Sequence, residues 1–154
     1  MKFLKNLLNV IALLFFSVLF SKVLLAQEFG SKDEAIDLLE RTENLIKVDK
    51  NRALELIVSG EGGLHPKDLY PFCLNDQGVL VAHPTNIGGN IMEFTDSSGK
   101  YVGKEMIAIA KYGEINTVDF IIARLTTNDE KEYKKTQLVK RMSGLICVVG
   151  YYTQ

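Results

Sequence analysis

The sequence has no tryptophan and only two cysteines and two histidines among its 154 residues. So few cysteines and histidines leave no cluster with the spacing of zinc ligands. The sequence also lacks a Gly-x-Ser-x-Gly nucleophile elbow, a phosphate-binding loop, an internal repeat and a low-complexity run. These absences argue against an enzyme and against a bound metal or cofactor, and we predict no catalytic residue.

Clustered basic residues are also missing beyond the first 26 residues. Lys2, Lys5 and Lys22 lie in that N-terminal stretch, and without them 15 basic residues remain against 19 acidic residues, a net charge of −4. Binding to nucleic acid needs concentrated positive charge. The composition therefore argues against a nucleic-acid partner.

Residues 1–26 have the layout of a secretory signal peptide. Two lysines precede an apolar core at residues 7–20, and Ala26 is a small residue at the expected cleavage site before Gln27. The alternative is an uncleaved membrane anchor, but Lys22 interrupts the apolar run, which falls short of the roughly 20 residues of a spanning helix. We therefore expect residues 27–154 to be periplasmic or secreted, or anchored to the inner membrane if the leader is retained.

Residues 32–59 are predicted to form a long amphipathic helix. Ser31 and Glu34 match a capping box, and apolar residues recur at helical spacing up to Gly60. Residues 48–51 are the weakest part, where we expect a kink or a break. The apolar stripe has two interpretations: packing against the protein's own sheet, which the imperfect repeat favours, or a dimer seam. We therefore expect a monomer, or a dimer through this helix.

Two short apolar runs, 69–74 and 79–82, are predicted to form a β-hairpin. Residues 75–78 supply its turn, and His83-Pro84 ends its second strand because proline cannot donate a hydrogen bond to a neighbouring strand. A polar loop with apolar anchors follows, and we expect it to form the wall of a pocket. Strands joined in hairpins with separate helices indicate an α+β fold with an antiparallel sheet. The remaining elements are a short helix at 101–112 and strands at 115–125, 132–142 and 145–152.

Seven short motifs follow one another along the chain: Asp68-Leu-Tyr-Pro-Phe-Cys-Leu-Asn-Asp-Gln-Gly78, Ala82-His-Pro84, Asp96-Ser-Ser-Gly-Lys-Tyr101, Lys104-Glu-Met106, Val118-Asp-Phe120, Val139-Lys-Arg141 and Val149-Gly150. In this order and spacing they resemble the single Cache domain, in its second single-Cache group. The resemblance covers about residues 31–152. It implies a PAS-like five-stranded antiparallel sheet, with a long N-terminal helix on one face and a loop and short-helix pocket on the other.

Domains of this family are extracytoplasmic sensors that bind small molecules, often short carboxylates, and most are followed by a kinase, cyclase or chemotaxis signalling module. The resemblance thus implies that residues 27–154 form a single Cache domain with a small organic ligand. Because the chain ends two residues after Tyr152, we expect a sensor without its own output domain, which could present its ligand to a membrane sensor protein. Phe120 and Leu138 stand where relatives often carry tyrosine. The alternative is therefore an interaction or structural module whose pocket is filled by its own side chains.

The implied pocket assigns ligand contacts to the hairpin, the short helix and the closing strands. Tyr70 and Phe72 share one face of the first strand. Leu138 and Lys140, which are also two residues apart, share one face of a strand that lies two strands away. Core packing is the alternative for Phe72, and a solvated edge is the alternative for Lys140. His83 is suited either to donate a hydrogen bond to a carboxylate or to cap the loop. The predicted ligand-binding residues are Tyr70, Phe72, His83, Tyr101, Met106, Phe120, Leu138 and Lys140.

The resemblance also bears on the only two cysteines, Cys73 and Cys147. In a PAS-like sheet the first and fifth strands are antiparallel neighbours, and a register that places Asn75 opposite Leu145 puts the two sulfurs across from each other. An exported protein meets oxidising conditions, so a disulfide is one hypothesis. The alternative is that both cysteines are small buried apolar residues.

Overall fold

The computed structural model describes residues 29–124, 127 and 130–153. The predicted signal peptide and its cleavage site lie outside these residues. Within the described part of the chain, no helix has both the length and the apolar character needed to cross a bilayer.

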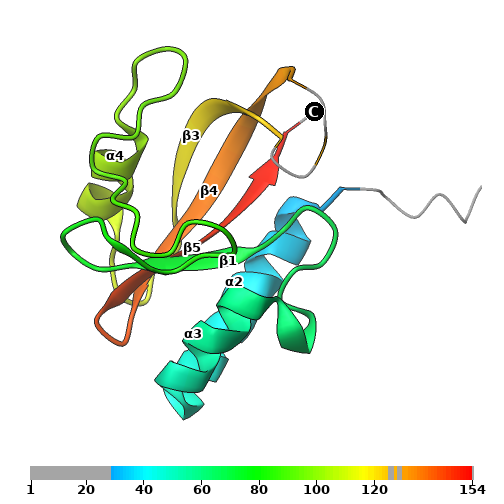
Figure 1. Ribbon diagram of the computed structural model, residues 1–154, viewed down its shortest axis with the longest axis vertical. Helices are drawn as coiled ribbons and strands as arrows, with labels where there is room; N and C mark the ends of the chain where they lie inside the picture. The colour runs from blue at the N-terminus through cyan, green and yellow to red at the C-terminus, as the bar shows by residue number, and fades with distance from the viewer. Residues whose placement is uncertain (1–28, 125–126, 128–129, 154) are drawn as a thin grey trace, which may run out of the picture.

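The strands form one antiparallel sheet in the order β2-β1-β5-β4-β3 (Figure 1). The first strand thus lies beside the last one, although most of the domain separates them in sequence. This topology confirms the α+β class and the PAS-like five-stranded sheet. The strands are β1 (Pro71–Leu74), β2 (Leu80–Ala82), β3 (Asn116–Ala123), β4 (Glu132–Met142) and β5 (Leu145–Tyr152).

The predicted long helix is two helices, α2 (Lys32–Val48) and α3 (Lys50–Ser59). The capping box is present, because the Ser31 hydroxyl accepts from the Glu34 amide and the Glu34 carboxylate accepts from the Ser31 amide. Asp49 has an extended backbone, and its carboxylate accepts a hydrogen bond from the Arg52 amide at 3.0 Å. The break that residues 48–51 predict is therefore confirmed, with Asp49 ending one helix and capping the next.

One face of the sheet is covered by α2 and α3 (Figure 1). Ala35 and Leu39 of α2 and Ile57 of α3 are fully buried in this layer. The apolar stripe thus packs on the protein's own sheet, as the favoured interpretation predicts. At the centre of the layer, Cys73 of β1 lies opposite Cys147 of β5, and the two form a disulfide with Cα atoms 4.1 Å apart.

The other face is covered by the loop after β2 and by α4 (Val102–Ile109) (Figure 1). Gly103 lets the helix approach the loop closely, because a Cβ at this position would collide with the Ile91 carbonyl oxygen. The helix ends three residues before the predicted Tyr112. Ala110 is already extended, and the Lys111 carbonyl accepts a hydrogen bond from the Arg141 amide at 3.0 Å. The chain at Lys111 therefore pairs with β4 instead of adding a further turn to the helix.

Candidate ligand-binding site

A cavity of about 240 Å³ lies between the sheet and the layer formed by the loop and α4. Its floor comes from β1, β3 and β4, and its walls come from β2, the loop and α4. Most of its lining side chains are apolar or aromatic, as is usual for small-molecule sites. The lining residues are Tyr70, Phe72, Leu80, His83, Thr85, Asn86, Ile91, Phe94, Met106, Phe120, Ile122, Lys135 and Gln137.

The structure brings together five of the eight side chains that the sequence indicated. They come from four different parts of the fold and line one cavity. These five are Tyr70, Phe72, His83, Met106 and Phe120.

Leu138 and Lys140, expected on the pocket floor, lie on the opposite face of the sheet. Leu138 is buried in the layer under α2 and α3, and the Lys140 ammonium donates to the Glu43 carboxylate of α2 at 2.6 Å. The prediction assigned these two residues to the wrong face of β4, because successive side chains of a strand point to opposite faces of the sheet. Lys135 and Gln137 line the cavity instead.

Tyr101 also lies outside the cavity. Its side chain is 47% exposed, and the Lys104 ammonium lies over its ring, 3.9 Å from the centroid. The prediction placed it inside because it assumed that the helix included residue 101, whereas the helix begins at Val102.

Lys135 is the feature of the cavity that the sequence prediction missed. Its side chain is 3% exposed, and its ammonium lies 5.0 Å from the centroid of the Tyr70 ring and 4.7 Å from that of Tyr152. Among residues 29–124, 127 and 130–153, no carboxylate lies within ion-pair distance of this ammonium. Burial lowers the pKa of Lys135 to about 8, against a smaller opposing effect of Asp68. A cation without a direct ionic partner thus faces the cavity.

A second buried cation, Arg124, lies close to Lys135. Its place at the end of a strand predicts a solvated side chain, but it is only 6% exposed. Its Nε lies 3.5 Å from Asp68 Oδ2, and its guanidinium lies over the Tyr152 ring at 4.7 Å. Asp68 Oδ1 in turn accepts a hydrogen bond from the Gly30 amide at 2.7 Å. Among the described residues, Arg124 and Lys135 are two buried cations beside one buried carboxylate, that of Asp68. One positive charge at this place is therefore not compensated.

Gly150 of β5 makes room for the polar part of the floor. It pairs with Gln137 of β4, and a Cβ at this position would collide with Gln137 Oε1 and lie 2.6 Å from Cε of Lys135. Gln137 Oε1 is buried without a hydrogen-bond partner in the described structure. Because unpaired buried polar atoms are costly, this amide is suited to a partner that occupies the cavity.

His83 caps the loop, one of the two roles considered from the sequence, and its ring also lines the cavity. Its Nδ1 accepts hydrogen bonds from the Thr85 and Asn86 amides, both at 3.1 Å, so the imidazole caps the loop. Nδ1 can accept only when unprotonated, which places the ring proton on Nε2. Burial, and then the charge of Lys135, lower the pKa of His83 below its usual value. A neutral imidazole at pH 7 therefore lines the cavity while holding its loop.

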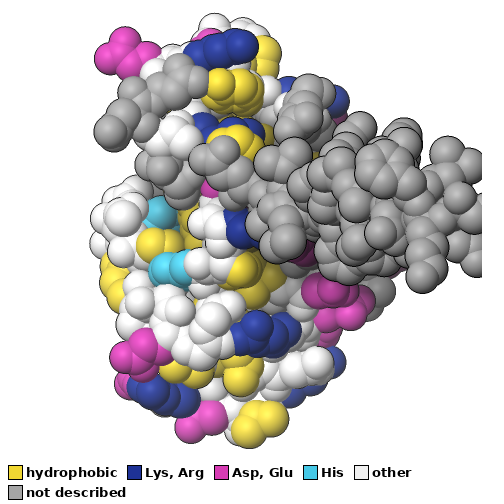
Figure 2. All heavy atoms as spheres, turned by 90° about the vertical axis from the view of Figure 1, so that its right-hand side faces the viewer, with side chains coloured by type: hydrophobic (Ala, Val, Ile, Leu, Met, Phe, Trp, Pro, Cys, Tyr) yellow, Lys and Arg dark blue, Asp and Glu magenta, His cyan; other side chains and the backbone are white. Residues whose placement is uncertain are grey.

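Tyr70 lies between the two histidines of the chain, in edge contact with each. Figure 2 shows both histidines (cyan) on one face, near apolar side chains. Burial raises the pKa of the Tyr70 hydroxyl to about 12, so it stays protonated and can donate. Tyr70, His83 and Thr85 also line an adjacent groove of about 180 Å³, so these side chains lie between the cavity and that groove.

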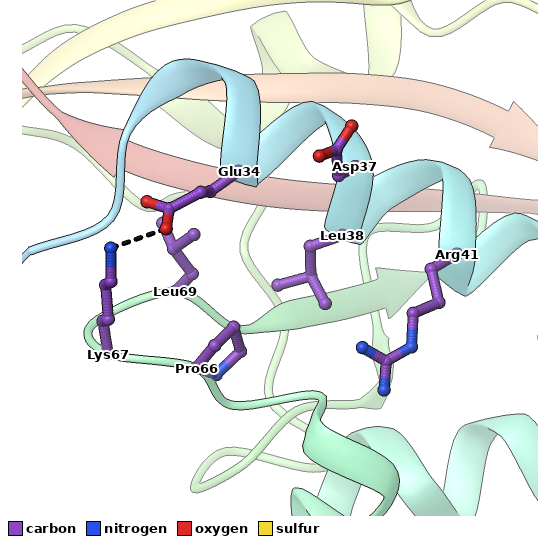
Figure 3. A pocket seen from close by; sticks show the side chains of 7 residues that line it. All are labelled: Glu34, Asp37, Leu38, Arg41, Pro66, Lys67 and Leu69. Carbon is purple, nitrogen blue, oxygen red and sulfur yellow. Dashed lines mark hydrogen bonds and ion pairs between the residues drawn. The ribbon is translucent and has the colours of Figure 1, made fainter.

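A groove of about 190 Å³ beside α2 is a weaker candidate. Figure 3 shows that Glu34 and Lys67 pair across it, with Asp37 and Arg41 further along the helix. All four charged side chains are exposed or half-buried, so water already stabilises them. The groove lacks the buried, uncompensated charge that distinguishes the cavity on the other face.

Comparison with known proteins gives a family-model match and several similar solved structures. The family model described as "Cache domain" matches residues 32–154. A methyl-accepting chemotaxis protein from Vibrio parahaemolyticus is 18% identical and has a TM-score of 0.62, with 79% of this chain and 87% of that chain covered. A periplasmic sensor domain of a chemotaxis protein is 18% identical, with a TM-score of 0.58 and coverage of 79% and 90%.

A third solved structure concerns carboxylic acid recognition by a Cache chemosensory domain. It is 23% identical, with a TM-score of 0.58 and coverage of 79% of this chain and 88% of that chain. At these identities the structural likenesses show the fold alone. Comparison with curated proteins gives no significant sequence match.

Proposed function

The chain belongs to the Cache domain family, and from this premise we propose that it is an extracytoplasmic sensor domain that binds a small organic carboxylate. The ligand occupies the cavity between the sheet and the layer of loop and α4. The function consists of binding, with no chemical conversion.

The observation that carries the proposal is the buried ammonium of Lys135. A buried charge is costly unless it is paired, and the described residues leave one positive charge in surplus around Asp68, Arg124 and Lys135. A carboxylate in the cavity would supply the missing negative charge. The solved Cache domain that recognises carboxylic acids supports the same class of ligand.

Neutral groups around Lys135 complement a carboxylate. The Tyr70 hydroxyl stays protonated and the neutral His83 carries its proton on Nε2, so both can donate hydrogen bonds. The Gln137 amide can present its N–H₂ group after rotation about its last side-chain bond. Charge-assisted hydrogen bonds of this kind are the stronger ones.

The proposed location is outside the cytoplasmic membrane. It rests on the signal-peptide layout of residues 1–26 and on the similarity to a periplasmic sensor domain. A membrane sensor protein that receives the ligand-bound domain is the proposed partner. We also propose that the domain is a monomer, because the buried residues of α2 belong to the layer between the helices and the sheet.

The test is calorimetric titration of the purified protein with a panel of monocarboxylates at pH 7, with Lys135→Met as the variant. We expect binding by the wild type and a loss of at least tenfold in affinity in the variant. Lys140→Met is the matched control, because Lys140 lies on the same strand but on the opposite sheet face. Its affinity should equal that of the wild type.

The pH dependence provides a second readout. Because the pKa of Lys135 is about 8 in the free protein, an anion that raises this pKa should bind about tenfold more weakly for each pH unit above 8. Absence of binding across the panel would overturn the proposal. It would favour the alternative, an interaction or structural module.

A further inference from the structure

We infer that the ligand is an amphiphilic monocarboxylate, with an aliphatic or aromatic apolar body of about five to seven carbon atoms attached to its carboxylate. This inference rests on the proposed function, because it assumes that a carboxylate pairs with Lys135. It narrows the ligand from short carboxylates in general to one chemical class.

The division of the cavity into a polar part and an apolar part motivates the inference. Lys135 and Gln137 lie on neighbouring inward positions of β4, beside the gap left by Gly150. On the other side of β4, Phe120 of β3 lies opposite Lys135 and meets Phe94 edge to face with centroids 5.9 Å apart, and Met106 extends this apolar wall. A ligand that fills both parts must carry a charge at one end and an apolar surface at the other.

The charge of the lining limits the ligand to one carboxylate. Lys135 and His83 are the only basic side chains that line the cavity within the described residues, and His83 Nδ1 accepts from the Thr85 and Asn86 amides, so the ring carries one proton and no charge. A second carboxylate would therefore meet apolar walls without a cation, and burying an unpaired charge is strongly unfavourable. Dicarboxylates fit this cavity poorly.

The size of the cavity sets the length of the apolar body. A volume of about 240 Å³ lies just below the roughly 300–1,000 Å³ of pockets for drug-sized ligands, so the cavity suits a smaller organic molecule. An acid as small as acetate would leave most of the apolar wall facing water. A ligand with about eight to ten non-hydrogen atoms would cover it, and each buried methylene should strengthen binding about fourfold.

The experiment measures affinities of the purified protein for acetate, butanoate, hexanoate and phenylacetate at pH 7. Succinate and the neutral phenylacetamide are included as chemical controls. We expect affinity to rise about fourfold per methylene from acetate to hexanoate, phenylacetate to bind at least as tightly as butanoate, and succinate and phenylacetamide to bind at least tenfold more weakly than phenylacetate.

Two variants test where the apolar body lies. Phe94→Ala should reduce the affinity for phenylacetate more than that for acetate, because it removes one aromatic wall. Tyr101→Ala should change neither, because Tyr101 lies outside the cavity on the same side of the molecule. If Phe94→Ala does not fold, the chain-length series of the wild type still decides the question.

Each outcome has a distinct meaning. If acetate binds as tightly as hexanoate, or succinate more tightly than phenylacetate, the inference is overturned and the proposed function stands. If none of the carboxylates binds, or phenylacetamide binds as tightly as phenylacetate, the proposed function fails and the inference fails with it. A rise in affinity with chain length that Lys135→Met abolishes supports both.

Discussion

Replacing Lys135 by methionine should make the unliganded protein more stable at pH 7. Below pH 8, Lys135 is protonated in both the folded and the unfolded states, so the folded state bears the full cost of the buried charge. The difference between the ordinary pKa of 10.5 and the value of about 8 corresponds to about 3 kcal/mol at 1.36 kcal/mol per pKa unit. Methionine has a similar length and carries no charge, so this cost disappears in the variant.

Lost interactions reduce the gain. The ammonium lies over the rings of Tyr70 and Tyr152, and each such contact contributes about 1 kcal/mol. We therefore expect a net stabilisation of about 1 kcal/mol, or roughly 3–5 °C in the midpoint of thermal unfolding for a domain of this size. The assay is chemical denaturation of wild type and variant at pH 7 and at pH 9.5.

The sign of the pH dependence follows from the lowered pKa. As the pH rises from 8 towards 10.5, the folded wild type loses the Lys135 proton before the unfolded chain does, so the cost of burial shrinks. The advantage of the variant should therefore be smaller at pH 9.5 than at pH 7. Lys140→Met, which removes an ion pair with Glu43, should instead lower stability. The reasoning is refuted if Lys135→Met is less stable than wild type at pH 7. It is also refuted if the difference in unfolding free energy between the two proteins is the same at pH 7 and pH 9.5.

Three further predictions concern the floor of the cavity, the buried ion pair and the disulfide. Gly150→Ala places a methyl group against Gln137; it should cost about 1–3 kcal/mol in unfolding free energy and weaken carboxylate binding at least tenfold by calorimetry. Asp68→Asn leaves the buried Arg124 without a counter-charge and should lower the unfolding free energy by about 3 kcal/mol, measured by denaturation in urea; no change would mean that the surrounding rings suffice to hold the guanidinium. A double Cys→Ala substitution opens a loop with a sequence separation of 74 and should cost about 4 kcal/mol; unchanged thermal unfolding under non-reducing conditions would contradict this.

The parts of the fold predicted correctly from the sequence are those with a strong local signal. The turn at residues 143–144 and the apolar run after it place β4 and β5 at the predicted residues. The break at Asp49 falls within residues 48–51, the weakest part of the predicted helix, and the structure adds that the Asp49 carboxylate caps the helix that follows. Capping and turn residues act over a few positions, so a sequence records them directly.

The faces of β4 were not predictable in the same way. Residues 135–139 are buried on both faces, which removes the alternation from which a face is normally assigned. Lys135 also stands beside Lys134 and Thr136, a polar context that indicates a solvated strand. Its burial depends on the space that Gly150 leaves in the neighbouring strand β5. Which residue of β5 lies beside Lys135 is set by the register between β4 and β5, and neither strand's sequence alone determines that register.

Adding ligand should make the wild type more stable than Lys135→Met, the reverse of the order without ligand. A ligand that binds only the folded state adds about 2.7 kcal/mol of stability at a hundred times its dissociation constant. The wild type gains this amount with hexanoate, whereas Lys135→Met, lacking the cation in the cavity, should gain far less. The variant that is about 1 kcal/mol more stable alone should therefore become the less stable protein at saturating hexanoate. Thermal unfolding of both proteins with and without hexanoate measures the crossing, and parallel shifts would mean that Lys135 does not contact the carboxylate.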